Sequence, residues 1–282
     1  MSSLALLAPA KINLCLHILG KRSDSYHNLS MLMEKVSLCD EIALEKISEG
    51  IELVDSNQKI PQEKNLVFRA AKLLLEASNA EWGVKIKLTK KIPVGGGLGG
   101  GSSDAATVLK GLNTLWGLNW PVERLAKLGV QLGADVPFFL YDGPAKVEGI
   151  GDLITPLEKL PNLSIILINP GIHVATPWAY STWDKKSKKR ELTQENQSVR
   201  SLCTFAEVIQ GLHNDFEEVV IPEYPEIQKV KEALTNAGAQ GALMSGSGST
   251  VFGLFKTVGA RDWALEKIDK KPAWQVFAVE NG

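Results

Sequence analysis

The feature that most constrains this chain is a run of glycines between residues 93 and 103. Six of these eleven residues are glycine, and two serines close the run. Glycine loses more backbone freedom on folding than any other residue, so a simple connector would not be expected to carry six of them. Apolar residues then recur at steps of three and four along 104–116. This spacing predicts a helix with Ser102 or Ser103 as its N-cap.

A glycine loop that leads into a helix can turn several backbone N–H groups toward one point, where the helix dipole also favours an anion. We therefore favour a phosphate-binding loop over a mobile surface loop before a capped helix. The residues that would form this loop are Pro93, Val94, Gly95, Gly96, Gly97, Leu98, Gly99, Gly100, Gly101, Ser102 and Ser103.

Two well-known glycine motifs fit the run less well. The P-loop requires a Lys-Ser or Lys-Thr pair after its last glycine, whereas this chain has Ser102 and Ser103 there. The spacing of Gly95, Gly97 and Gly100 matches the dinucleotide fingerprint, but that fingerprint follows a buried parallel strand. The preceding stretch 84–88 alternates apolar and basic residues instead, which is typical of a half-exposed strand.

Composition narrows the class of protein. The chain has 282 residues, is 44% hydrophobic and 22% charged, and carries a net charge of -1. Such a chain is globular and has no overall attraction for nucleic acid or anionic membranes, so a bound anion needs a local site. We expect no signal peptide and no membrane-spanning segment. Cys15, Cys39 and Cys203 show neither metal spacing nor a disulfide framework, which predicts a reducing cytoplasmic location, with Cys15 and Cys39 as packing residues.

Residues 10–18 alternate in a way that predicts a strand. Ile12, Leu14 and the apolar residues that follow at steps of two would face the core. Lys11 and Asn13 would project side by side from the opposite face. Each of these two, taken alone, is either a solvent-exposed residue or part of a site.

The rest of the pattern mixes helices and strands without regular βαβ units, which predicts an α+β protein. Asp135 lies between a helix end at Gly133 and an apolar stretch, and it either shapes a turn or serves a site. The basic segment 184–197 is taken as a solvated loop. We expect strands at 31–37, 41–47, 51–54, 84–88, 136–140, 163–168, 242–255 (two strands and a loop) and 274–279, and helices at 65–78, 121–132, 199–211, 223–237 and 259–269.

Three segments in this order, 9–14, 93–103 and 245–252, resemble the motifs of the galactokinase, homoserine kinase, mevalonate kinase and phosphomevalonate kinase (GHMP) superfamily. The segments 25–29, 132–137 and 169–171 resemble one branch of it, whose substrate is a methylerythritol linked to cytidine diphosphate. The resemblance covers nearly the whole chain and keeps the order and spacing of the motifs. One departure is Ser25, where the family usually has glycine, and a positive φ there would strain a serine.

The resemblance implies a two-domain GHMP-kinase-like fold. Residues 1–160 would form the N-terminal nucleotide-binding domain and residues 161–282 a C-terminal mixed α/β sandwich, with the substrate in a cleft between them. It implies an enzyme that uses ATP and Mg²⁺ to phosphorylate a hydroxyl of that small molecule. It implies no nucleic-acid or membrane partner and leaves monomer and homodimer open. The alternatives are a kinase for homoserine or a mevalonate-like alcohol, a non-catalytic nucleotide- or RNA-binding module and, more distantly, a dinucleotide oxidoreductase.

The same resemblance implies residue roles. Asp135 would accept the proton of the acceptor hydroxyl, and Lys11 would stabilise the developing alkoxide and the transferring phosphoryl group. Because the pKa of a free aspartate is about 3.9, far below that of an alcohol, Asp135 would take the proton late. Asp104 would either reach the Mg²⁺ ion or lie in the first turn as a capping group, and Trp178 competes with Tyr180 for the cytidine. The substrate side would comprise Asn13, Tyr26, His27, Tyr180, Ser245, Gly246, Ser247 and Gly248.

Overall fold

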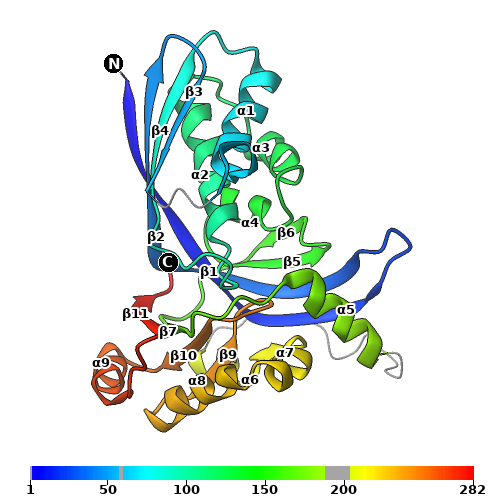
Figure 1. Ribbon diagram of the computed structural model, residues 1–282, viewed down its shortest axis with the longest axis vertical. Coiled ribbons are helices and arrows are strands. Elements are labelled where there is room, and N and C mark those ends of the chain that lie inside the picture. Colours follow the sequence, from blue (N-terminus) through cyan, green and yellow to red (C-terminus); the bar gives the residue numbers. More distant parts are fainter. Residues whose placement is uncertain (1, 57–59, 188–203) are drawn as a thin grey trace. The chain divides into compact units, whose positions relative to one another are not determined.

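The computed structural model describes residues 2–56, 60–187 and 204–282, which form two compact units. Strands β1 (Ser3–Lys21) and β2 (His27–Ile47), both labelled in Figure 1, each contribute residues to both units. The glycine run is likewise divided between the two units. A division of the chain into functional domains at residue 160 stays a prediction. The first unit comprises Met1–Ala10, Leu38–Val94 and Gly99–Asp142, and the second comprises Lys11–Ser37, Gly95–Leu98 and Gly143–Gly282.

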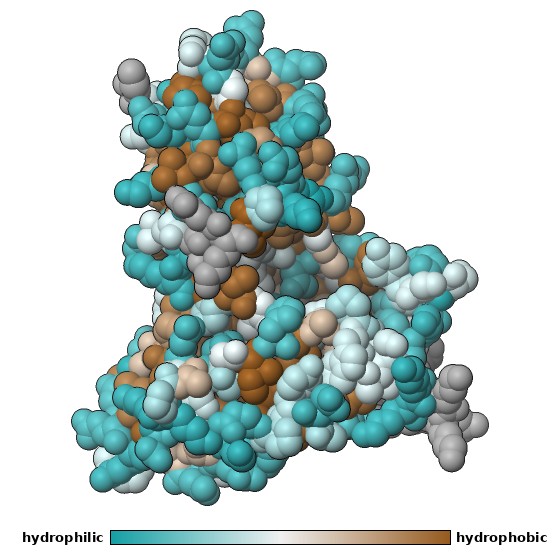
Figure 2. Space-filling view, viewed as in Figure 1, coloured by the Kyte–Doolittle hydropathy of each residue, from teal (hydrophilic) through white to brown (hydrophobic). Residues whose placement is uncertain are grey.

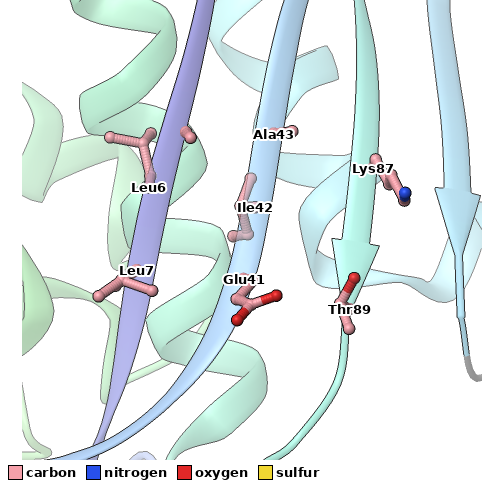
Figure 3. A pocket seen from close by; sticks show the side chains of 8 residues that line it. Leu6, Leu7, Glu41, Ile42, Ala43, Lys87 and Thr89 are labelled. Atoms are coloured by element: carbon pink, nitrogen blue, oxygen red, sulfur yellow. The ribbon is translucent and has the colours of Figure 1, made fainter.

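The first unit contains a sheet with the strand order β3–β4–β2–β1. Strand β3 (Ile51–Asp55) pairs in parallel with β4 (Gly83–Thr89), and β4 pairs antiparallel with β2. The apolar residues of β4 are buried while Lys85 and Lys87 are exposed, which confirms the predicted half-exposed strand. A shallow pocket of about 350 Å³ lies over β1, β2 and β4, and Figure 3 shows the side chains that line it.

Helices complete the first unit. They are η1 (Gln62–Lys64), α1 (Leu66–Ser78), α2 (Gly100–Leu115), α3 (Val122–Gly129) and α4 (Val136–Leu140). The side chain of Asn65 accepts the N–H of Val67 at 3.0 Å, which confirms the predicted start of α1. At Gly111 in α2 an added Cβ would lie 2.5 Å from the side chains of both Leu44 and Leu6, so any larger residue here would displace those two side chains.

The strands of the second unit belong to two sheets. One is the same seven-stranded sheet that contains β3 and β4, and its order here is β6 (Leu153–Pro156), β5 (Ala145–Gly149), β2, β1 and β8 (His213–Asn214), with β8 parallel to β1. The other is antiparallel, in the order β11 (Gln275–Glu280), β7 (Ser164–Asn169), β10 (Val251–Phe255) and β9 (Gly241–Met244). Every residue of β7 is buried, as its apolar run predicts.

Helices α8 (Pro225–Asn236) and α9 (Val258–Lys267) pack on this antiparallel sheet (Figure 1). The other helices of the second unit that the structure describes are α5 (Thr176–Ser187), α6 (Phe205–Gln210) and α7 (Glu217–Glu223). The sequence pattern predicted neither α5 nor α7. The helix expected at 199–211 is described only from residue 204, and its start, together with Cys203 and most of the basic segment, lies outside the described residues.

Four expectations about elements are wrong. Residues 184–187, expected in a solvated loop, form the end of helix α5, where the carboxylate of Asp184 bonds to Lys21 and His27. The segments 31–37 and 41–47 form one continuous strand, because the polar Asp40 between them is buried and accepts the N–H groups of Lys91 and Ile92. The stretch 136–140 is helix α4, because Pro137 sits in its first turn, where no N–H is needed, and a short apolar run does not reveal its period. Helix α3 ends at Gly129, earlier than residue 132.

The surface is mixed in character. Figure 2 shows hydrophilic side chains over much of the visible face, with hydrophobic ones between them. Within the described residues, no helix combines the length and the apolar character that crossing a bilayer requires.

Candidate active site

The part of the glycine run in the second unit, 95–98, is held in one conformation. Gly95 and Gly97 have φ values of 70° and 78°, in the left-handed region that favours glycine. A Cβ at Gly97 would lie 2.1 Å from the carbonyl oxygen of Ser245. Thr250 donates its N–H to Gly96 at 3.1 Å, and Lys11 donates its own to Leu98 at 2.9 Å. The loop therefore lies against strand β1 and the loop 245–250.

The part of the glycine run in the first unit begins helix α2. Gly99, with φ 68°, is the N-cap, and Ser102 and Ser103 lie inside the first turn, so the predicted serine N-cap is wrong. The reason is backbone conformation, since glycine takes a left-handed cap at no steric cost. No side chain caps the helix. A helix that begins in this way presents backbone N–H groups and the positive end of its dipole to an anion.

Lys11 and Asn13 share one face of β1, as predicted, but the face is covered rather than exposed. Their exposed fractions are 4% and 2%. The Nζ atom of Lys11 donates to Oδ1 of Asn13 and, at 2.8 Å, to the carbonyl oxygen of Gly97. Because a buried ammonium is costly without such bonds, this arrangement excludes the interpretation of both residues as solvent-exposed.

The loop between β9 and β10, residues 245–250, covers this face. The hydroxyl of Ser245 accepts the N–H of Asn13 at 3.3 Å and donates to Gly97 at 3.0 Å. Asn214 donates its amide N–H to the carbonyl oxygens of Met244 and Gly246, at 2.7 and 2.8 Å. The hydroxyl of Ser245 thus ties this loop both to β1 and to the glycine run.

Asp135 lies in the first unit, immediately before α4. Its side chain is half-buried and does not cap that helix. The turn that carries it lies beside the start of α2, because a Cβ at Gly133 would lie 3.9 Å from Oγ of Ser102. The first unit therefore places a hydroxyl and the segment bearing a carboxylate near the same helix start. Lys11, the other predicted catalytic residue, belongs to the second unit.

A buried ion-pair cluster supports the start of α2 in the first unit. Nζ of Lys90 donates to Oδ2 of Asp104 at 2.6 Å and to Oδ2 of Asp40. Burial raises the pKa of Asp104 to about 7, although the charge of Lys90 opposes the shift. The predicted capping role of Asp104 is thus wrong. Lys90 and Asp40 were not predicted, and the only signal in the sequence is the position of Lys90 just before the glycine run.

An aromatic cluster surrounds His27 in the second unit. The ring of Tyr180 stacks on the imidazole, with 4.6 Å between centroids and an interplanar angle of 15°. The imidazole Nε2 lies 2.6 Å from a carboxylate oxygen of Asp184, a residue that no local pattern in the sequence singles out. Trp178 packs against Tyr224 instead, so it is Tyr180 that lies at His27.

Tyr26 precedes this cluster and is 60% exposed. The loop before it carries Ser25 with φ 70°. The strain that the sequence predicts for a serine at this position is therefore present.

Comparison with known proteins identifies the family. The model of the GHMP kinases N terminal domain matches residues 65–143, and that of the GHMP kinases C terminal matches residues 197–272. The 4-diphosphocytidyl-2-C-methyl-D-erythritol kinases of Geobacter sp. (strain M21) and Syntrophus aciditrophicus (strain SB) are 49% and 43% identical to this chain, each over 99% of both sequences.

Solved structures agree with this result. The crystal structure of 4-(cytidine 5'-diphospho)-2C-methyl-D-erythritol kinase superposes with a TM-score of 0.81 at 35% identity, covering 99% of each chain. The homoserine kinase from Cytophaga hutchinsonii superposes with a TM-score of 0.73 over 99% of this chain and 94% of its own. At 23% identity, that second likeness shows the fold alone.

Proposed function

We propose roles for these residues from the premise that this chain belongs to the 4-diphosphocytidyl-2-C-methyl-D-erythritol kinases, within the GHMP kinases. The chain is an ATP-dependent kinase that phosphorylates the 2-hydroxyl of 4-diphosphocytidyl-2-C-methyl-D-erythritol, in the methylerythritol phosphate route to isoprenoids. The homoserine or mevalonate kinase and the RNA-binding module are not favoured, because eight relatives that are 39% to 49% identical to this chain carry the same name, 4-diphosphocytidyl-2-C-methyl-D-erythritol kinase.

The phosphates of ATP would be bound by the glycine run, Pro93 to Ser103. Two observations support this proposal: the left-handed glycines at 95, 97 and 99 and the uncapped start of α2. Backbone N–H groups in this arrangement suit phosphate oxygens.

Mg²⁺ would be held by oxygen donors of the first unit. The hydroxyl of Ser102, at the start of α2, is an oxygen ligand of the type that this ion prefers. Asp104 fits less well, since Lys90 already bonds to one of its oxygens. When bound, the ion would neutralise charge on the β- and γ-phosphates.

The transfer itself would depend on Lys11 and Asp135. The observation that carries this proposal is the 2.8 Å bond from Nζ of Lys11 to Gly97, which places a buried ammonium directly at the glycine loop. A positive charge there would stabilise the transferring phosphoryl group. Asp135 would orient the acceptor hydroxyl and take its proton as the new P–O bond forms.

The cytidine would be recognised by His27, Tyr180 and Tyr26. A neutral imidazole that donates Nε2–H to Asp184 has Nδ1 as an acceptor, and the exocyclic amine of cytosine is a donor. The rings of Tyr180 and Tyr26 would supply aromatic surface for stacking on the base.

The remaining substrate contacts would come from Asn13 and the loop Ser245, Gly246, Ser247 and Gly248. Asn13 would act mainly by holding Lys11, whose ammonium it binds. We also propose a cytoplasmic location, supported by the free thiols of Cys15 and Cys39, and a protein without nucleic-acid or membrane partners that is either a monomer or a homodimer.

The test is ATP consumption by the purified protein with 4-diphosphocytidyl-2-C-methyl-D-erythritol, beside homoserine and mevalonate. We expect turnover with the cytidine compound alone. We also expect Asp135→Asn to lose nearly all turnover while ATP still binds in a calorimetric titration. Equal turnover of a substrate that lacks cytidine would refute the assigned substrate, and an unchanged rate in Asp135→Asn would remove this residue from the mechanism.

A further inference from the structure

Strands β1 and β8 place metal-binding side chains on one face of the sheet in the second unit. In β1 the side chains of Cys15 and His17 point to the same face, because they are two residues apart. In the parallel pairing of β1 with β8, Cys15 lies beside His213. Asp215 is two residues beyond His213, so its side chain is expected on the same face. The N–H of Asp215 also bonds to Leu16 at 3.1 Å, so the ladder extends to this residue. None of these side chains has a role in the proposed phosphoryl transfer.

Three of the four converge. The donor atoms of His17, His213 and Asp215 all lie within 4.8 Å of one another. The two imidazole rings stack with 4.3 Å between centroids, and Nε2 of His213 lies 2.8 Å from Oδ1 of Asp215. The second oxygen of Asp215 accepts the N–H of Ile18 at 2.7 Å, which fixes the carboxylate. A backbone bond of this kind orients a metal ligand.

The chemistry of this set favours a transition-metal ion over Mg²⁺. Two imidazole nitrogens and one carboxylate oxygen are the ligands that Zn²⁺ takes from proteins, often with a fourth position open, whereas Mg²⁺ prefers oxygen alone. The side chain of His213 is 41% exposed, so an ion can reach the set from solvent. The stacked rings would turn about their Cβ–Cγ bonds to direct both nitrogens at one ion.

We propose that His17, His213 and Asp215 form a binding site for a divalent transition-metal ion, with Zn²⁺ as the best fit. The ion would tie β8 to β1, the strand that also carries Lys11. Its role is structural, and the site is independent of the function proposed above.

The test uses the full chain, treated with a chelator and then titrated with Zn²⁺ in a calorimeter and with Co²⁺ in an absorption spectrometer. We expect one ion per chain and a visible Co²⁺ spectrum of tetrahedral type. Both His17→Ala and His213→Ala should weaken Zn²⁺ binding by about tenfold or more, as the loss of a ligand or of its orienting partner does. His173→Ala, which removes an exposed histidine outside the set, should bind Zn²⁺ like the wild type.

A second readout guards against misfolding. Zn²⁺ should raise the thermal unfolding temperature of the wild type and of His173→Ala but not that of His213→Ala, whose circular dichroism spectrum should match the wild type. Equal Zn²⁺ affinity in the wild type and in the double variant His17→Ala/His213→Ala would overturn the proposal. Binding of Mg²⁺ as tightly as Zn²⁺ would overturn it as well.

Discussion

Gly97→Ala is the most informative single substitution, because residue 97 is the glycine of the loop 95–98 whose added Cβ would come closest to another part of the backbone. Gly97 has φ 78°, and its added Cβ would lie 2.1 Å from the Ser245 carbonyl oxygen and 3.1 Å from that of Gly248. A left-handed conformation costs alanine about 1–2 kcal/mol. Overpacking against backbone that has to shift costs about 1–3 kcal/mol more. We expect Gly97→Ala to lower the free energy of unfolding by about 2–5 kcal/mol in total.

Gly97→Ala should also lower the rate of catalysis, because moving the loop would shift the hydrogen bonds that the Gly97 carbonyl oxygen accepts. The carbonyl oxygen of Gly97 accepts from both Lys11 and Ser245, at 2.8 and 3.0 Å. Moving this oxygen would shift the buried ammonium from its place at the loop. Since small misplacements of such groups are costly, we expect kcat/KM to fall by about a hundredfold.

Gly50→Ala is the matched control, because Gly50 also has φ 78° but nothing lies within 4 Å of its added Cβ. The free energies of unfolding of the two variants, measured in urea, should therefore differ only by the cost of overpacking at Gly97, about 1–3 kcal/mol. Gly50→Ala should keep wild-type turnover. If Gly97→Ala were no less stable than Gly50→Ala and turned over substrate normally, the close packing of the two loops would be refuted.

Three other predictions follow from single residues. Lys11→Ala should lower kcat strongly, and a rise in KM alone in steady-state kinetics would make Lys11 only a binding residue. Ser25→Gly should raise the free energy of unfolding in urea by about 1 kcal/mol by relieving φ 70°, and a loss of stability would contradict the strain. Burial raises the pKa of Glu34 from 4.5 to about 7, so its contribution to stability is full below pH 4.5 and is lost as pH rises through 7. The loss is at most about 3 kcal/mol, and Glu34→Gln should flatten the pH dependence of urea unfolding over this range.

Much of the local structure could be read from the sequence. The glycine run was correctly placed just before a helix, and α1 begins where the sequence predicts, with the side chain of Asn65 accepting the N–H of Val67. The alternation at 84–88 gave the buried and exposed faces of β4 correctly. These features depend on residues within a few positions of one another, so a local pattern suffices.

Other features depended on residues far apart in the chain. Lys11 and Asn13 are buried because the loops 95–98 and 245–250 cover their face of β1. The partner of Asp104 is Lys90, and the carboxylate that binds His27 comes from Asp184. No periodicity links such positions.

What the sequence alone determined, then, was which residue types meet the needs of phosphate binding and where the helices and strands broadly run. Only the tertiary structure decided which polar side chains are buried and which groups they form hydrogen bonds with. The physical reason is that burying a charge is favourable only when its hydrogen-bond partners are in place. For Lys11, one of those partners is the carbonyl oxygen of Gly97, 86 positions along the chain.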